Sequence, residues 1–476
     1  MIRLSRTFLI LAVVAIVGLI PLIGPQAQPA ERLLKALRAQ TGVPGMAAAV
    51  ARDGELLWHF EVGFAELEKA RPVGPDTIFR LASVSKAVCS VMAARLLEKG
   101  TLSLDARVGE LLPQQPQQYR GLLFRDLMTH SSGLPHYQLR DAGRGRRHYE
   151  SALQGLAELG DRELVDVPGA TYLYSTHGFS LASAMMEAAA GQSFPDLFAR
   201  LITGTAAGAG ITLESLKRTY KDRSEIYAGH RGRAPRRLVR EDFSYSWCGA
   251  GMQSSAAGLA RFGASLFGPG GLLGQAGQAL IRHPLAGRDG QEIKGDRWLM
   301  TLGWRRGRDQ GGDVFIHHAG VTNGARSVLA VWPEKRLAAA LVSNASWTGR
   351  MEATAEALAA AATASVEPPI CPPSGSAAYR GSLAGAALTA RIEWRAAGRD
   401  CIGRMSGENA LAAWVSRFNF AAVSGFPLIQ LDADRWGLVT PIGISILTGS
   451  ASRLEGLVGS RLLELGRLDG PGEEEE

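Results

Sequence analysis

The sequence predicts an α+β protein in which one antiparallel sheet lies beside a separate lobe of helices. Strand-like segments open and close the region 31–366, and helical segments fill its middle. Strands that are distant in sequence must then share one sheet, and a cleft between that sheet and the helices is the expected place for a site. An apolar N-terminal segment and a C-terminal region of short β-type runs add two further parts.

Composition bounds the class of protein. The chain has 476 residues, of which 46% are hydrophobic and 20% are charged. Those values exclude a disordered chain, and the length leaves room for two or three domains with large cores. The 52 Lys and Arg against 45 Asp and Glu give a net charge of +7. That excess is compatible with an acidic partner, with an anionic membrane surface or with no partner at all.

Residues 1–30 have the layout of a secretory signal or a signal anchor. Arg3 and Arg6 precede 17 residues without a charge, Phe8–Gly24, which as a helix span about 25 Å. The candidate cleavage points after residues 24, 27 and 30 lack the small residue that is needed at position −3, where they have Leu22, Pro25 and Gln28. We therefore expect an uncleaved inner-membrane anchor with the rest exported to the periplasm or extracytoplasmic space; cleavage and secretion are the alternative.

The sheet and its helices can be placed in order along the chain. A hairpin is expected over Met46–Glu66, because two apolar runs flank the turn dipeptide Asp53-Gly54. A helix follows over Ser83–Lys99, with apolar residues at helical spacing and Gly100 at its end. The remaining elements are mostly helices as far as Phe267, strands at Val314–His318, Ala325–Trp332 and Leu337–Ser343, and a helix at Met351–Thr363.

Past residue 366 the composition changes. Residues 367–376 hold four prolines and indicate a linker. Residues 471–476 form an acidic tail. Between them, residues 377–470 predict a small antiparallel β domain, because short β-type runs alternate with turn residues there: Leu388–Arg395, Trp414–Ala421, Leu428–Leu431 and Gly437–Leu447.

The four cysteines are too few for the disulfide framework of a small secreted protein. Cys89 and Cys248 lie in apolar stretches and are expected to be buried free thiols. Cys371 and Cys401 lie 30 residues apart in the C-terminal region. An oxidising compartment would let them pair, but the sequence leaves both outcomes open because it does not give their Cα separation.

Ser83 and Lys86 form an S-x-x-K motif at the start of the first long helix. Residues three apart share one helix face, and the N-terminus of a helix favours the negative charge of an acyl-transfer transition state. A serine needs a base to become a nucleophile, and a lysine can be that base when burial or a neighbouring cation lowers its pKa. Taken alone, the motif is also explained by an N-capping serine and a surface lysine.

Other short motifs follow in order: residues 122–137, residues 168–182 with Tyr174-Ser175-Thr176, residues 244–262, and residues 315–327 with His318-Ala319-Gly320. In order and spacing these motifs resemble those of the serine β-lactamase and penicillin-binding-protein-like hydrolases, in particular the class C β-lactamase-related branch. The resemblance covers roughly residues 35–365. It implies a β-lactamase-like antiparallel sheet flanked by helices with a helical lobe, in agreement with the prediction made from the strands and helices.

The resemblance implies roles for the matching residues. Ser83 would be the nucleophile that forms an acyl-enzyme, Lys86 its partner base, and Tyr174 the residue that carries protons to the leaving group. A buried Lys–Tyr pair can share one proton and act first as base and then as acid. Backbone N–H groups of Ser83 and Val321 would form the oxyanion hole. The predicted substrate-binding and oxyanion residues are His318, Gly320, Val321 and Thr176.

Two positions depart from the pattern of a good β-lactamase. Thr176 stands where such enzymes have Asn, so it lacks an NH₂ donor for the substrate amide. His318 stands where they have a Lys that faces the antibiotic's carboxylate, and histidine is largely neutral at pH 7. Both changes affect β-lactam recognition, so an ester, amide or D-peptide is the expected substrate. A β-lactamase or DD-peptidase and a non-catalytic sensor or scaffold are the alternatives.

No nucleotide or metal motif is present, and we predict no cofactor and no metal. The net charge is concentrated in residues 217–240, which hold nine Lys and Arg against Asp222 and Glu225. So confined a basic stretch, with few aromatic residues for stacking, argues against nucleic acid. It predicts contact with anionic lipid beside the anchor, attraction of acidic substrates, or only a solvated loop.

Overall fold

The computed structural model describes residues 28–138, 141, 144–229, 234–347, 349–364, 372, 374–397, 400–407, 425–458 and 461–468. The acidic tail and most of both the N-terminal membrane segment and the Pro-rich linker lie outside these residues, so these three parts stay predictions. Within the described ranges, no helix combines the length and the apolar character that crossing a membrane requires.

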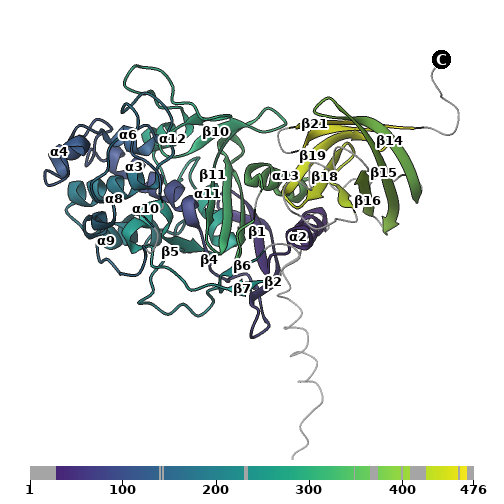
Figure 1. Cartoon of the computed structure of the whole chain (residues 1–476), viewed down its shortest axis with the longest axis horizontal. Helices are drawn as coiled ribbons and strands as arrows, with labels where there is room; N and C mark the ends of the chain where they lie inside the picture. The colour runs from purple at the N-terminus through teal and green to yellow at the C-terminus, as the bar shows by residue number, and fades with distance from the viewer. Residues whose placement is uncertain are drawn as a thin grey trace, which may run out of the picture.

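The core of the protein is an eight-stranded antiparallel sheet (Figure 1). Strand β1 (Gly45–Arg52) pairs with β13 (Leu337–Ser343), so the predicted pairing of strands from opposite ends of the region is confirmed. The strand order β3-β2-β1-β13-β12-β11-β10-β9 places β11, which carries His318, near one edge. The other strands of this sheet are β2 (Glu55–Glu66), β3 (Arg71–Pro72), β9 (Leu299–Met300), β10 (Arg305–Arg308), β11 (Val314–Thr322) and β12 (Ala325–Trp332).

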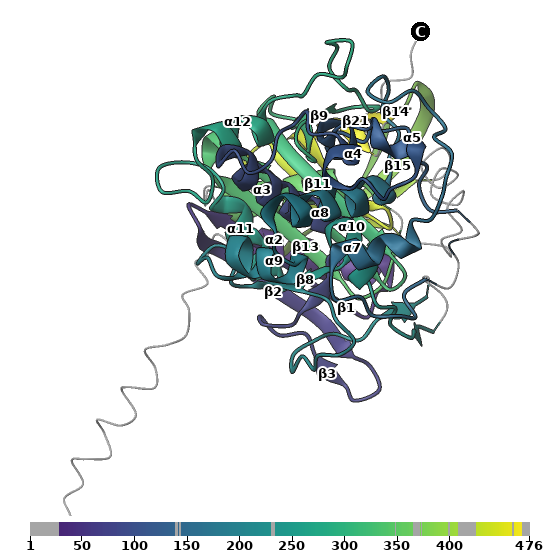
Figure 2. The ribbon, with the colours of Figure 1, turned by 90° about the vertical axis from the view of Figure 1, so that its left-hand side faces the viewer.

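The sheet has two apolar faces, because successive side chains of a strand point to opposite sides. In β1 the odd-numbered residues 47–51 join one core and the even-numbered residues 46–50 join another. Helices α3 (Ser85–Glu98), α8 (Thr176–Ala190) and α11 (Ala256–Ala264) belong to the first core and lie in front of the sheet in Figure 2. Helices α2 (Gln28–Thr41) and α13 (Met351–Thr363) belong to the second.

The middle of the chain is more broken than the predicted run of helices. A fully buried ion pair between Arg80 and Glu214, with Nη2 and Oε1 2.7 Å apart, ties its loops together. Its shorter elements are α4 (Val108–Leu111), α5 (Gln117–Arg120), α6 (Phe124–Met128), α7 (Ala152–Gly155), α9 (Phe194–Phe198), α10 (Trp247–Ala250), α12 (Gln275–Arg282), β4 (Phe79–Arg80), β5 (Ile211–Leu213), β6 (Tyr227–Ala228), β7 (Arg236–Arg237) and β8 (Met252–Ser254).

The C-terminal region is a closed antiparallel barrel of eight strands, which confirms the predicted small β domain. Side chains fill its interior: Trp394 and Trp436 lie 5.1 Å apart, and Trp394 Nε1 donates to Tyr379 Oη at 3.0 Å. The predicted single run Gly437–Leu447 is in fact a hairpin, and the run 414–421 lies outside the described residues. The strands are β14 (Gly375–Leu383), β15 (Ala386–Ala397), β16 (Asp400–Gly407), β17 (Phe426–Gln430), β18 (Arg435–Thr440), β19 (Gly443–Ser450), β20 (Arg453–Val458) and β21 (Arg461–Arg467).

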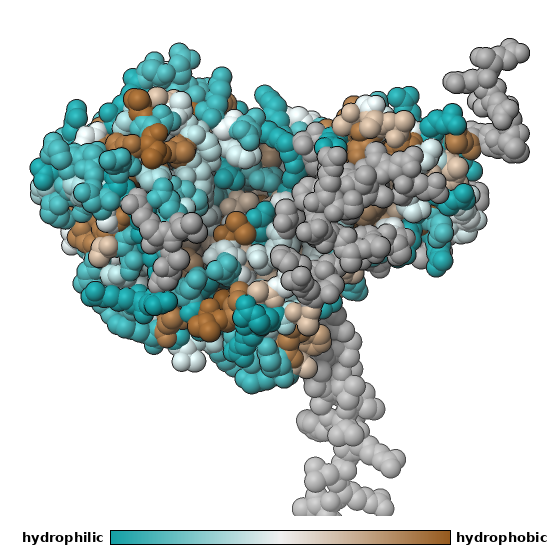
Figure 3. All heavy atoms as spheres, viewed as in Figure 1, coloured by the Kyte–Doolittle hydropathy of each residue, from teal (hydrophilic) through white to brown (hydrophobic). Residues whose placement is uncertain are grey.

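The barrel packs against the second face of the sheet through α2 and α13, which lie between them in Figure 1. Ile429, Val439 and Ile444 of the barrel join the core of that face. In addition, the backbone N–H of Ile444 donates to Thr354 Oγ1 of α13 at 3.1 Å. On the face that Figure 3 shows, hydrophilic residues predominate and apolar residues gather in small separate patches. The barrel therefore buries the apolar surface that α2 and α13 would otherwise expose.

The prediction that Cys89 and Cys248 are free thiols is wrong, because they form a disulfide. Helices α3 and α10 pack together and bring the two Cα atoms to 5.2 Å, the ordinary separation for a disulfide. The residues are 159 positions apart in sequence, so no spacing rule indicated the pairing. Cys401 is also disulfide-bonded, whereas Cys371 lies outside the described residues, so the predicted pairing of these two stays a prediction.

Much of the charge in the basic segment 217–240 is paired. Arg240 contacts the buried Glu214 at 2.9 Å, and Arg237 contacts Glu225 at 2.8 Å. Lys217 contacts Glu150. Residues 230–233 lie outside the described part of the chain. Pairing of this kind lowers the charge that the segment offers to a lipid surface or an acidic substrate.

Candidate active site

Ser83 is held at the N-terminal end of α3 by a strained turn. It lies in a single 3-10 turn, Ala82–Val84, and Ala82 before it has a φ of +48°, a conformation that costs a non-glycine residue about 1–3 kcal/mol. Strand β11 of the sheet packs directly against this turn. A Cβ on Gly320 would lie 2.4 Å from Leu81 O and 3.0 Å from Ser83 N, so glycine is required for the strand to approach the serine.

The Lys86 amine lies next to Ser83, as the S-x-x-K spacing predicts. Its Nζ atom lies 3.2 Å from Ser83 Oγ, 3.1 Å from Thr176 Oγ1 and 2.7 Å from Gly249 O. On the other side of the serine, the Tyr174 hydroxyl donates to Ser83 Oγ at 2.8 Å. The structure thus brings the predicted nucleophile, base and proton carrier together, and Thr176 contacts the lysine.

The environment sets which groups carry protons. Burial, and secondarily the nearby Arg305, holds the pKa of Lys86 well below its ordinary value. Burial also raises the pKa of Tyr174 above its ordinary value. A buried site disfavours the charged form of each. Lys86 and Tyr174 were predicted to share one proton. Burial favours the form of the pair in which the Lys86 amine is neutral and the Tyr174 hydroxyl keeps the proton.

Two buried histidines flank Tyr174, and burial holds the pKa of each well below its ordinary value. His318 Nδ1 lies 2.8 Å from the carbonyl of Ala319 and therefore carries the proton. His130 Nδ1 accepts from the Ser175 N–H at 3.1 Å, so its proton is on Nε2. His318 is fully buried 6.4 Å from the Tyr174 ring and does not line the cavity described below. Its predicted contact with substrate stays a prediction.

Arg305 on β10 is a site residue that the sequence did not indicate. Its guanidinium lies 5.7 Å from the Tyr174 ring and 4.6 Å from the Trp298 ring. We expected that burial or a neighbouring cation would lower the pKa of a catalytic lysine. Here burial has the larger effect and Arg305 is the neighbouring cation. Arg305 belongs to a run of basic residues on a short strand, and that pattern by itself is typical of a solvated edge.

Ser83 and Tyr174 open into a cavity of about 620 Å³. Four alternate residues of β11 line it: Phe315, His317, Ala319 and Val321. From Phe315 to Val321 the strand extends about 20 Å, at about 3.3 Å per residue, so the cavity is about 20 Å long. Val321, predicted to supply an oxyanion N–H, has 54% of its side chain exposed there. Leu457 of the barrel lines the cavity as well, so both domains contribute to its wall.

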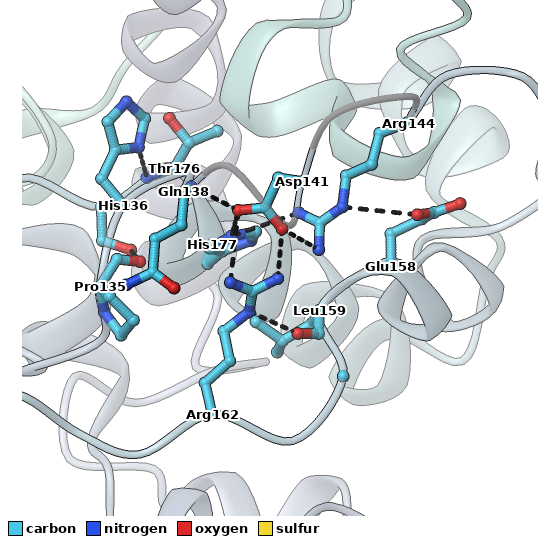
Figure 4. A network of polar contacts seen from close by, with 12 residues as sticks. Pro135, His136, Gln138, Asp141, Arg144, Glu158, Leu159, Arg162, Thr176 and His177 are labelled. Atoms are coloured by element: carbon cyan, nitrogen blue, oxygen red, sulfur yellow. Dashed lines mark hydrogen bonds and ion pairs between the residues drawn. The ribbon is translucent and has the colours of Figure 1, made fainter.

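A buried ion-pair network holds the loop that contributes His136 to the cavity wall (Figure 4). Asp141 lies 2.5 Å from both Arg144 and Arg162. The same loop carries His136, whose Nδ1 accepts from the Thr176 N–H at 3.3 Å. His136 lines the cavity, and burial lowers its pKa to about 4. The network therefore positions a neutral histidine beside Tyr174.

The beta-lactamase family model matches residues 30–364 of the chain, which is well over half of its length. The chain belongs to the beta-lactamase family. This confirms the resemblance that the ordered motifs indicated, and with it a serine hydrolase family that includes penicillin-binding proteins, esterases and D-aminopeptidases. Among the described residues, no group of three or more His, Cys, Asp or Glu side chains is placed to hold a metal ion.

Two curated relatives illustrate the range of the family. The human serine beta-lactamase-like protein LACTB, mitochondrial, is 25% identical over 394 residues, which cover 64% of this chain and 71% of that protein. The esterase EstB of Burkholderia gladioli is 35% identical over 163 residues, which cover 31% of this chain and 41% of that protein. The family is therefore shown, while the substrate of this chain is not.

Two solved structures share the fold. A class C beta-lactamase superposes with a TM-score of 0.59 at 18% identity, over 72% of this chain and 97% of the other. The octameric penicillin-binding protein homologue from Pyrococcus abyssi superposes with a TM-score of 0.59 at 17% identity, over 92% of this chain and 99% of the other. At these identities the likeness establishes the β-lactamase-like fold, and the second match extends over the barrel as well.

Proposed function

We propose that the protein is an exported serine hydrolase that cleaves an ester, amide or D-peptide through an acyl-enzyme on Ser83. One observation carries the proposal: Ser83 Oγ lies between the Tyr174 hydroxyl at 2.8 Å and the buried Lys86 amine at 3.2 Å. That is the arrangement of a nucleophile between a proton donor and a base. Among the described contacts of Ser83 Oγ none is with a histidine, so the geometry favours Lys86 as the base.

The geometry supports a two-step reaction. The neutral Lys86 amine takes the Ser83 proton while Oγ attacks the substrate carbonyl, and the N–H groups of Ser83 and Val321 receive the developing oxyanion. Tyr174, which keeps its proton because burial raises its pKa, gives it to the leaving group. Water then attacks the acyl-enzyme with the same groups in reverse roles, and Ser83 regains its proton.

Two contacts support an ester, amide or D-peptide over a β-lactam as the substrate. Thr176 has no side-chain amide to donate to a ligand. Its hydroxyl is buried and contacts the Lys86 amine at 3.1 Å instead. His318 is buried and neutral, so it offers no positive charge to a carboxylate. The relative named as an esterase is consistent with this choice.

Export and a membrane tether through residues 1–30 are parts of the same proposal. The disulfide between Cys89 and Cys248 supports an oxidising compartment. Contact of segment 217–240 with anionic lipid would depend on those basic residues for which no ion pair is seen among the described residues, Arg218, Lys221, Arg223 and Arg236. Cell fractionation, followed by protease treatment of intact spheroplasts, tests both: a protein that stays soluble and protected in the cytoplasm contradicts export.

The test of the activity is covalent labelling together with turnover. A fluorophosphonate probe should label the wild type at Ser83 but not Ser83→Ala, and the wild type should hydrolyse p-nitrophenyl acetate or butyrate or a D-alanyl peptide. Absence of both labelling and turnover in a folded preparation excludes the proposal. Faster turnover of nitrocefin than of the esters and peptides would favour the β-lactamase alternative, and a cellular function retained by Ser83→Ala would favour the scaffold.

A further inference from the structure

We propose that the Cys89–Cys248 disulfide positions Lys86, by holding the Gly249 carbonyl against the lysine amine so that the amine's lone pair faces Ser83. The inference rests on the proposed function, since it concerns the base of that reaction. Cys89 and Cys248 are positioning residues, because neither touches the reacting atoms.

The crosslink lies directly beside the base. Lys86 and Cys89 are three residues apart on α3 and therefore share one face of the helix. Cys248 immediately precedes Gly249, the residue whose carbonyl lies 2.7 Å from Lys86 Nζ. Both cysteines are fully buried. The disulfide thus fastens α10 to α3 at the level of the catalytic amine.

The Gly249 carbonyl decides where the amine points. A neutral amine has two N–H groups and one lone pair, and it has three close neighbours here. Gly249 O can only accept, so it fixes one N–H, and Thr176 Oγ1 accepts the second. The lone pair is left facing Ser83 Oγ, the atom whose proton it has to take. Without the carbonyl, the amine could rotate and direct an N–H at the serine instead.

The disulfide is the covalent link at the residue next to Gly249, while noncovalent contacts hold the two sides of the segment: Trp247 stacks on Phe194, and the Met252 N–H donates to Ser85 Oγ at 3.0 Å. Helix α10 has only four residues, Trp247–Ala250, too few to be stable on its own. A Cβ on Gly249 would lie 2.3 Å from Ser246 Oγ and 2.5 Å from Thr176 Cγ2, so the segment packs directly on the amine's second partner. A small shift of α10 would therefore disturb two of the three contacts of Lys86.

The double variant Cys89→Ala/Cys248→Ala tests the inference in the full chain. We expect kcat for p-nitrophenyl acetate to fall about tenfold, with KM changed by less than about twofold, because the base is misdirected while the cavity is intact. We also expect the acid limb of kcat/KM to move to higher pH by about one unit. Water would reach Lys86 and raise its pKa towards the ordinary value. Titration of Ser83 with the fluorophosphonate probe corrects for inactive protein.

We assign the acid limb to Lys86 because its amine lies 3.2 Å from Ser83 Oγ and is the base of the proposed reaction. The titratable and charged groups that face the amine are Tyr174, His130, His136, His318 and Arg305. Burial favours the neutral form of the tyrosine and of the three histidines. A purely structural effect of losing a crosslink would lower the melting temperature and leave the limb in place.

Two further variants keep the result interpretable. Cys371→Ala/Cys401→Ala removes the other two cysteines, of which Cys401 lies in the core of the barrel, and it should leave the acid limb unchanged. Gly249→Ala keeps the disulfide but displaces the carbonyl, so it should move the limb to higher pH even if the first variant does not fold. An acid limb that stays in place, or moves to lower pH, in Gly249→Ala or in folded Cys89→Ala/Cys248→Ala overturns the inference.

Failure of the inference and failure of the proposed function give different results. A wild-type protein that neither hydrolyses the ester nor labels at Ser83 removes the proposed function and the inference with it. An active, labelled wild type whose disulfide variant keeps the same kcat and pH profile removes only the positioning role.

Discussion

The two ends of the active-site cavity differ in charge. At the Ser83 end, burial favours an unprotonated Lys86, a protonated Tyr174 and uncharged histidines, and the Arg305 guanidinium lies 5.7 Å from the Tyr174 ring. At the other end, towards the barrel, charged side chains and one exposed leucine line the cavity. Those far-end residues are Arg308, Asp309, Arg350, Glu352, Glu356 and Leu457.

The difference lies mainly within the β-lactamase-like domain, which supplies every far-end residue except Leu457 of the barrel. A base of low pKa requires removal from water, and the β-lactamase-like domain supplies this through its first core. The far end does not touch the reacting atoms, so its residues can affect which substrate binds without affecting the proton transfers. Burial raises the pKa of Glu356 at that end to about 7, so its charge changes near neutral pH.

The largest effect is expected where the base is removed. Lys86→Ala should lower kcat/KM by roughly 100- to 10,000-fold, the usual contribution of a general base. Ser85→Ala is the matched control, since its buried hydroxyl only accepts the Met252 N–H at 3.0 Å, and we expect activity per folded molecule to change less than about threefold. Steady-state kinetics with p-nitrophenyl acetate decide. Retention of more than about a tenth of the activity by Lys86→Ala would exclude it as the base.

The pH dependence of the wild type should show the low pKa of the base. The active form has Lys86 neutral, and its lowered pKa means that this form persists as the pH falls well below 10.5. kcat/KM should therefore be constant from about pH 10 down to the lowered pKa of Lys86 and fall about tenfold per pH unit below it. No loss is expected near pH 10 from Tyr174, because its pKa is raised. An acid limb near pH 10 would show that Lys86 is not desolvated in solution.

Much of the near end could be predicted from the sequence, because its motifs are local. Ser83 and Lys86 lie on one helix turn, and the strands that frame them have clear apolar patterns, so the strands Ala325–Trp332 and Leu337–Ser343 and the helix Met351–Thr363 have the predicted bounds. The α+β class followed from the same patterns. Tyr174 came from the resemblance, since nothing in its own stretch distinguishes it from a half-buried tyrosine.

The rest depended on contacts between distant segments. Arg305, the Gly249 carbonyl and the Cys89–Cys248 disulfide reach the site only after α3, α10 and β10 have packed together. The apolar setting of the two cysteines suggested burial, which is correct, but it carried no information about a partner. The sequence also did not predict that the barrel contributes to the cavity. Short β-type runs indicate that a β domain exists, but they do not indicate where it packs.

A smaller effect is expected at Arg305. Replacing it separates the two causes of the low pKa of Lys86, namely burial and a neighbouring positive charge. Arg305→Gln removes the cation beside Lys86 and should raise the pKa of the lysine, which moves the acid limb to higher pH by up to about one unit. Arg306→Gln is the matched control, because this neighbour on β10 does not line the cavity. The pH profiles of both variants provide the measurement. An unchanged profile in Arg305→Gln would mean that burial alone depresses the pKa of Lys86.

The smallest effect is expected at the barrel end. Leu457 has 45% of its side chain exposed and lines the cavity, so Leu457→Ala should weaken a ligand that reaches it by about 1 kcal/mol, or about fivefold in KM. A p-nitrophenyl ester of a six-residue peptide spans about 20 Å, the length of the cavity, whereas the acetate is far shorter.

Leu462 provides the control for this change. It lies directly opposite Leu457 on the neighbouring strand and is 48% exposed, but it does not line the cavity. Leu462→Ala should therefore leave KM for both esters unchanged, and Leu457→Ala should change it for the peptide ester alone. If Leu457→Ala changed KM equally for the two esters, the barrel would act on the stability of the whole fold and not on substrate binding. The far end would then not be where the protein selects its substrate.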